Sequence, residues 1–227
     1  MTGSASHDAL MTTPTSTTTD HRTDRPSDPR PLLDRAIGTA GVVIAGVRPD
    51  QLADPTPCED MDVRVLLGHL IGVVDRIAAL GHGEDPFGVT ETPVPDDGWA
   101  AAWTDAGRRA AEAWSDDAVL ERPMALPWLQ GSGAEVLTSY LSELTVHTWD
   151  LATATGQQPD WEDAVVVAAL SANHILPAED RRALYAEISA AMGLDEVAVP
   201  FAEAVPVPDD APAIDRLVAW NGRDPGR

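Results

Sequence analysis

The segment from about Ala134 to Thr155 constrains the fold more than any other part of the chain. If it is helical, apolar side chains cover most of its circumference: Leu137, Leu141, Leu144, Val146, Trp149 and Leu151. A helix that is apolar on most sides must be covered by other elements of the protein. This segment therefore predicts a largely buried helix inside a helical fold.

Apolar residues recur at helical spacing in much of the remaining chain. The expected helices cover residues 31–47, 62–80, 96–116, 134–155, 159–175, 178–192 and 213–220. Residues 84–95 and 122–133 are rich in Pro and Gly and are expected to be loops, and no segment sustains the alternation of a strand. We predict an all-α fold in which the first four helices form a bundle, with additional C-terminal helices.

The length of 227 residues suits one domain of ordinary size. Residues 1–28 contain mainly Thr, Ser, Pro and Asp with few apolar side chains, so we expect this segment to be disordered. The remaining residues, 29–227, are expected to form a single metal-binding helical domain.

A net charge of −22, from 37 acidic and 15 basic residues, argues against nucleic acid or an anionic membrane as a partner. No run of 18 apolar residues predicts a transmembrane helix, and the N-terminus lacks the pattern of a secretory signal. Cys58 is the only cysteine, so no internal disulfide can form. These features together predict a soluble cytoplasmic protein.

The helix expected at 134–155 carries one polar stripe. Glu143 and His147 are four residues apart and project from one face, with Tyr140 and Asp150 on the same line. Unpaired charge is costly inside a protein, so this stripe needs partners. A metal ion would satisfy Glu143 and His147 together, whereas an ordinary ion pair is the alternative.

A third candidate ligand, His69, lies at the edge of the apolar stripe of the helix expected at 62–80. A histidine packed in the core is the alternative there. Two histidines and one glutamate match the three-ligand pattern of catalytic zinc sites, which keep a position for water or substrate. Asp150 would then orient a ligating histidine, or else form a salt bridge at the helix end.

Two segments resemble a known family. PTPCEDMDVRVLLGHLIGV at 55–73 is similar to the second-helix motif of the DinB-like, mycothiol-dependent maleylpyruvate isomerase superfamily, and SELTVHTWDLATATG at 142–156 is similar to its ligand-bearing helix. The C-terminal stretches VPVPDD, DRLVA and GRDP resemble the actinobacterial metal-binding branch. The resemblance spans about residues 30–225, although Met61 stands where an aromatic residue is common.

This resemblance implies a DinB-like four-helix bundle with a divalent metal held by His69, Glu143 and His147. Zinc is the expected ion, and nickel or another divalent metal is the alternative. Characterised members of the superfamily use mycothiol or bacillithiol as isomerases and transferases. The resemblance thus implies mycothiol as a cosubstrate.

The function predicted from these features is metal-dependent activation of a low-molecular-weight thiol for S-transfer, or for isomerisation of a small electrophilic substrate. The alternatives are a hydrolase or lyase that uses metal-bound water, and a non-catalytic binding or stress-response protein. No catalytic residue is assigned. The expected partners are the substrate, the thiol and a second copy of the chain in a homodimer.

Four residues are candidates for contact with the substrate. Arg76, two helical turns beyond His69, would hold a carboxylate or form a salt bridge, and Tyr140 shares the stripe of Glu143. Trp128 precedes the ligand-bearing helix and would line the pocket or join the core, and Arg223 would reach the pocket from the C-terminal tail. Cys58 lies near a helix start, where a thiolate is favoured, but is expected to serve packing.

Overall fold

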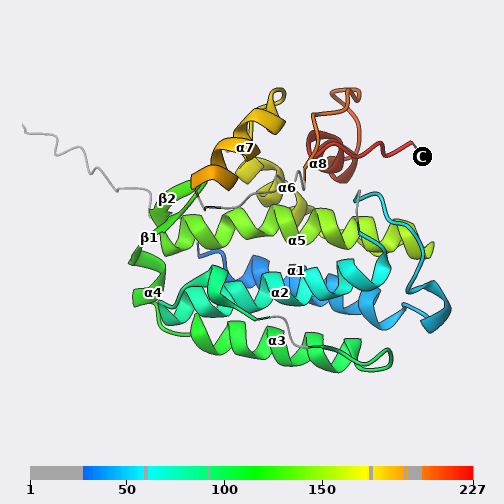
Figure 1. Cartoon of the computed structure of the whole chain (residues 1–227). Coiled ribbons are helices and arrows are strands. Elements are labelled where there is room, and N and C mark those ends of the chain that lie inside the picture. Colours follow the sequence, from blue (N-terminus) through cyan, green and yellow to red (C-terminus); the bar gives the residue numbers. More distant parts are fainter. Residues whose placement is uncertain are drawn as a thin grey trace, which may run out of the picture.

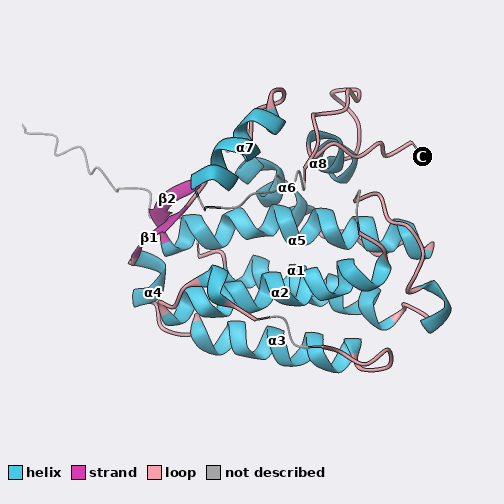
Figure 2. Ribbon diagram, viewed as in Figure 1, coloured by secondary structure: helices cyan, strands magenta, loops and turns pink. Residues whose placement is uncertain are grey.

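The computed structural model describes residues 28–58, 61–90, 93–173, 176–191, 193 and 201–226. Four long helices form its main body: α1 (Arg30–Ala45), α2 (Val63–His82), α3 (Trp99–Ala113) and α5 (Gly133–Thr155). Figures 1 and 2 show them lying side by side, with α6 (Asp163–Ala172), α7 (Arg181–Ala191) and α8 (Ala213–Trp220) beyond α5. The predicted all-α class is confirmed. The prediction of disorder for residues 1–28 falls almost entirely outside the described residues.

The directions of the four long helices follow from contacts at their ends. Arg64 pairs with Asp96 just before α3, and Arg109 pairs with Asp75 further along both helices, so α2 and α3 run in the same direction. The side chain of Gln51, in a 3₁₀ turn (Pro49–Gln51) after α1, donates to the carbonyl of Thr155 at the end of α5. Helices α1 and α5 are therefore parallel to each other. Arg30, at the start of α1, donates to the carbonyl of Trp114 just after α3, so this pair is antiparallel to α2 and α3. This topology requires the long connection over residues 83–98, which includes a 3₁₀ turn (Pro86–Gly88).

Polar side chains cap the starts of α2 and α5. The Asp62 side chain accepts a hydrogen bond from the backbone N–H of Val65 at 2.8 Å at the start of α2. Ser132 and Glu135 form a reciprocal capping box at the start of α5. Both helices end at glycines with positive φ, Gly83 and Gly156. The bounds of both helices lie within one or two residues of those expected from the sequence.

One expectation was wrong. Residues 122–133 do not form a simple loop, because β1 (Pro123–Leu126) and β2 (Leu129–Ser132) pair as an antiparallel hairpin after the short helix α4 (Ala118–Glu121). Strands of four residues are too short to show a sustained alternation, which is why the pattern missed them. The hairpin ends at Ser132, and so delivers the chain directly to the cap of α5.

Helix α5 is deeply buried along most of its length. Five of its aliphatic side chains are fully buried: Leu137, Leu141, Leu144, Val146 and Leu151. Two indole N–H groups tie α3 to its neighbours, since Trp103 donates to the carbonyl of Ile37 at 3.0 Å and Trp114 to that of Ile77 at 2.7 Å. The burial predicted for the segment 134–155 is confirmed. Among the described residues, no helix is long and apolar enough to span a membrane.

The start of α5 depends on a glycine. A Cβ added at Gly133 would lie 2.1 Å from the carbonyl oxygen of Val119, whereas one added at exposed Gly38 in α1 would meet nothing within 4 Å. We expect Gly133→Ala to lower the free energy of unfolding by about 1–3 kcal/mol, because the backbone of α4 must move. Gly38→Ala should raise it by about 0.5–1 kcal/mol. Urea denaturation checks both, and equal stability of the two variants would contradict the prediction.

Candidate metal centre

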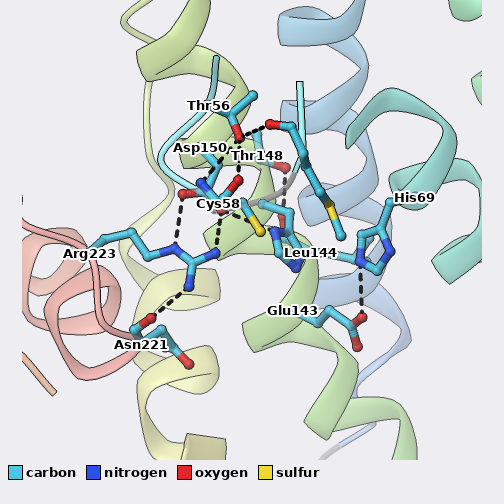
Figure 3. A network of polar contacts seen from close by, with 11 residues as sticks. Thr56, Cys58, His69, Glu143, Leu144, Thr148, Asp150, Asn221 and Arg223 are labelled. Carbon is cyan, nitrogen blue, oxygen red and sulfur yellow. Dashed lines mark hydrogen bonds and ion pairs between the residues drawn. The ribbon is translucent and has the colours of Figure 1, made fainter. Parts of the chain in front are cut away.

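The three ligands expected from the sequence come together between α2 and α5. His69, Glu143 and His147 each offer a ligand atom, and these atoms lie within 4.8 Å of one another. His69 Nε2 is 3.3 Å from Glu143 Oε1, and Figure 3 shows the two side chains pointing toward each other. The rings of His69 and His147 meet edge to face with centroids 4.7 Å apart. The trio is thus a possible metal-ligand group.

The environment of His147 fits a cation at one ring nitrogen. This side chain is fully buried, and its Nδ1 lies 3.0 Å from Asp150 Oδ2. Its Nε2 has no hydrogen-bond partner among the residues that the structure describes. A buried polar atom without a partner is uncommon in folded proteins and calls for an explanation. A divalent ion at Nε2 supplies one, because a carboxylate on the opposite nitrogen is typical of ligating histidines.

Electrostatics favour the neutral form of His147 and the ionised form of Glu143. Burial lowers the pKa of His147, although Asp150 opposes this effect, so the neutral imidazole is favoured. Burial raises the pKa of Glu143, but its contact with His69 and the nearby charge of Arg76 help to bring it below its ordinary value. A neutral imidazole and an ionised carboxylate are the ligating species.

Asp150 connects His147 to the C-terminal tail. Arg223 donates from Nε to Asp150 Oδ1 at 3.1 Å and from Nη2 to Asp150 Oδ2 at 2.8 Å, as Figure 3 shows. Asp150 is fully buried, and Arg223 also donates to the carbonyl of Asn221 at 2.7 Å. One carboxylate therefore both contacts the ring of His147 and forms a buried ion pair with Arg223.

An aromatic ring covers His147 on the side of the tail. Phe201 stacks on the imidazole with centroids 5.4 Å apart and an interplanar angle of 25°. The guanidinium of Arg223 lies 5.4 Å from the centroid of the same ring. Nothing in the sequence pattern pointed to Phe201, because it follows residues 194–200 in a stretch without periodicity. Phe201 and Arg223, both in the C-terminal tail (residues 201–226), thus cover His147: Phe201 lies on its ring, and Arg223 binds the Asp150 carboxylate that contacts its Nδ1.

Comparison with known proteins supports the family expected from the two motifs. The family model described as the mycothiol maleylpyruvate isomerase N-terminal domain matches residues 33–152, which is more than half of the chain. The chain belongs to this family. The matched region runs from α1 to α5 and contains all three candidate ligands.

Two relatives extend the similarity beyond that domain. They are uncharacterised proteins of Mycobacterium tuberculosis, from strains CDC 1551 / Oshkosh and ATCC 25618 / H37Rv. Each is 29% identical over 196 residues, which cover 86% of this chain and 98% of the relative. No solved structure matches the chain.

The remaining candidates occupy different surroundings. Tyr140 lies one turn before Glu143, is 2% exposed, and has no hydrogen-bond partner for its hydroxyl within the described part of the chain. Burial and the charge of Glu143 raise its pKa well above the ordinary value, so the phenol stays protonated. Arg76 is close enough to Glu143 to affect its pKa. Trp128 instead lies in the turn of the hairpin, edge to face with Phe87 at 6.0 Å.

Cys58 lies closer to the centre than the sequence analysis suggested. Its sulfur forms a second possible ligand group with His147 and Asp150, within 4.8 Å, and it also interacts with Arg223. Thr56 stabilises the segment that carries Cys58: its hydroxyl accepts from the N–H of Cys58 at 3.1 Å and donates to the carbonyl of Met61 at 2.8 Å. The Pro-rich composition around Cys58 indicated a loop but not its direction.

The Asp150–Arg223 pair gives a test of how the tail is held. Asp150→Asn leaves the buried guanidinium without its carboxylate and should lower the free energy of unfolding by about 3–5 kcal/mol. Asp150→Asn combined with Arg223→Met should be less destabilised than the sum of the two single variants. Asp96→Asn, which breaks the exposed Arg64–Asp96 pair, should change stability little. Urea denaturation of the metal-free protein measures all four variants, and additive effects of Asp150 and Arg223 would contradict the coupling.

Proposed function

We propose that this protein is a divalent-metal-dependent enzyme that activates a low-molecular-weight thiol of the mycothiol type. The reaction is S-transfer to a small electrophilic substrate, or its isomerisation by addition and elimination of the thiol. The observation that carries the proposal is the buried, unpartnered Nε2 of His147 beside His69 and Glu143. Membership of a family defined by a mycothiol-dependent isomerase supports the choice of thiol.

The donor set favours zinc, because two imidazole nitrogens and one carboxylate oxygen are common zinc ligands. His69, Glu143 and His147 would hold the ion and would leave it able to bind an exogenous group, which a closed structural site does not. A zinc ion at this site would lower the pKa of a thiol bound to it, so that the nucleophilic thiolate is present at neutral pH.

Residues of the chain prepare this centre for catalysis. Asp150 fixes the orientation of the His147 ring through Nδ1, and Arg223 keeps Asp150 ionised by its two hydrogen bonds. Phe201 excludes water from one face of the imidazole. The protonated hydroxyl of Tyr140 can donate a hydrogen bond to negative charge that develops on a substrate oxygen. Arg76 supplies a nearby positive charge for a substrate carboxylate.

Metal content tests the ligand assignment. Purified protein should contain about one zinc ion per chain, and His69→Ala, Glu143→Gln and His147→Ala should each reduce this strongly because three ligands are needed. His82→Ala, at the exposed end of α2, should retain wild-type metal content. Inductively coupled plasma mass spectrometry gives the metal-to-protein ratio. Full retention of metal in His147→Ala would refute the assignment.

The role of the thiol is tested on cobalt-substituted protein. Mycothiol should add a thiolate-to-cobalt charge-transfer band, because its sulfur would enter the open position of the ion. The measurement is the ultraviolet–visible absorption spectrum during titration, with the oxidised disulfide of mycothiol as a control that lacks a thiol. A spectrum unchanged by mycothiol would favour metal-bound water as the reactive group, or a non-catalytic role.

A further inference from the structure

A cavity of about 870 Å³ lies beside the candidate metal centre. Its wall comes from α2, from α3 and from parts of the connection between them, and His69 forms part of that wall. The volume falls within the range of about 300–1,000 Å³ typical of small-molecule sites. Of the three candidate ligands, His69 is the one that lines the cavity, so the cavity borders the candidate centre at this ring, whose Nε2 is buried.

Two glycines leave the α2 side of the cavity bare. Gly68 and Gly72 both line it, and a Cβ added at either position would meet no atom within 4 Å. They are four residues apart, so they lie on the same face of the helix. Glycine destabilises a helix interior relative to alanine, and close packing does not require it here. The open space is instead available to a ligand lying against the backbone of α2.

Both arginines of the wall are paired with carboxylates. Arg64 forms hydrogen bonds with Asp96, one of them 3.1 Å long, and Arg109 donates from Nε to Asp75 at 3.1 Å. Neither arginine therefore presents an uncompensated charge to a phosphate or a polycarboxylate. Ion-paired guanidinium and carboxylate groups keep further donor and acceptor sites, which suit the hydroxyl groups of an uncharged ligand.

Apolar surface lies among these polar groups. Met61, Ile71, Val94 and Trp99 line the cavity, and Trp99 is 8% exposed. The indole Nε1 of Trp99 has no hydrogen-bond partner among the described residues. An aromatic ring with an unused donor can pack against the C–H face of a saturated ring and also bind its hydroxyl. Such a mixture of surfaces suits a sugar-like ring better than a flat hydrocarbon.

We infer that this cavity binds the uncharged, polyhydroxylated ring body of the thiol cosubstrate, with its sulfur directed toward His69. Arg64 and Asp75 are eleven residues apart on α2, which places the two ion pairs about 16 Å apart along the helix axis and leaves room for linked rings between them. His69 lies between these positions in the sequence. The inference rests on the proposed thiol dependence and adds where, and by what chemistry, the thiol is recognised.

The test fills the cavity without touching the ligands of the metal. Zinc-loaded, full-length Gly68→Leu should bind mycothiol at least tenfold more weakly than wild type in isothermal titration calorimetry. Gly38→Leu, at an exposed position in α1 with the same open surroundings, should bind like wild type. Zinc content and melting temperature should remain close to wild type in both variants. Equal affinity of Gly68→Leu and wild type for mycothiol would overturn the inference.

A thiol without the ring body separates this inference from the proposed function. 2-Mercaptoethanol should change the cobalt spectrum of wild type and Gly68→Leu alike, which assigns the loss of mycothiol affinity to the cavity. If neither thiol changes the spectrum, the proposed function fails. The sulfur-free N-acetylglucosaminyl-inositol, in which the nitrogen is an uncharged amide as it is in mycothiol, then tests the cavity alone. Binding by wild type but not by Gly68→Leu would support the cavity, and no binding by wild type would overturn it.

Discussion

The buried carboxylate of Asp150 is the interaction on which the candidate centre depends. It contacts the ring of His147 at 3.0 Å and receives two hydrogen bonds from Arg223. A buried carboxylate is stable only when it is paired and hydrogen-bonded, so the tail that carries Arg223 must close over α5 for the helix to tolerate it. The position of the histidine is thereby coupled to the packing of a segment more than 70 residues away in the chain.

The bundle topology sets the position of His69, the candidate ligand on α2, and of the residues around it. Because α2 and α3 are parallel, the connection over residues 83–98 must return along the bundle, and part of it lines the cavity beside α2. His69 thus lies where α2 meets α5 on one side and the cavity on the other. The same connection that makes the parallel arrangement possible also lines the space next to the candidate metal centre.

The sequence predicted the features that arise from short-range periodicity. The polar stripe of α5 and the border position of His69 followed from helical spacing, and the bounds expected for both helices lie within two residues of the observed ones. The contacts of Cys58 and Phe201 did not follow, because both residues lie in irregular segments whose direction is set by tertiary contacts. The hairpin at 123–132 was missed for a similar reason, since pairing between strands of four residues depends on the turn and on the adjacent helix start.

The two sides of the centre differ in access, and this difference indicates how a ligand enters. On the tail side, Phe201 stacks on His147 and Arg223 is 4% exposed, so protein fills that side. On the opposite side, the side chains of His69 and Glu143 are 16% and 21% exposed. An exogenous group must therefore approach past His69 and Glu143, while Asp150 and Arg223 act from behind His147. Closure on one side and an opening on the other let a single buried histidine be held rigidly while the centre remains accessible.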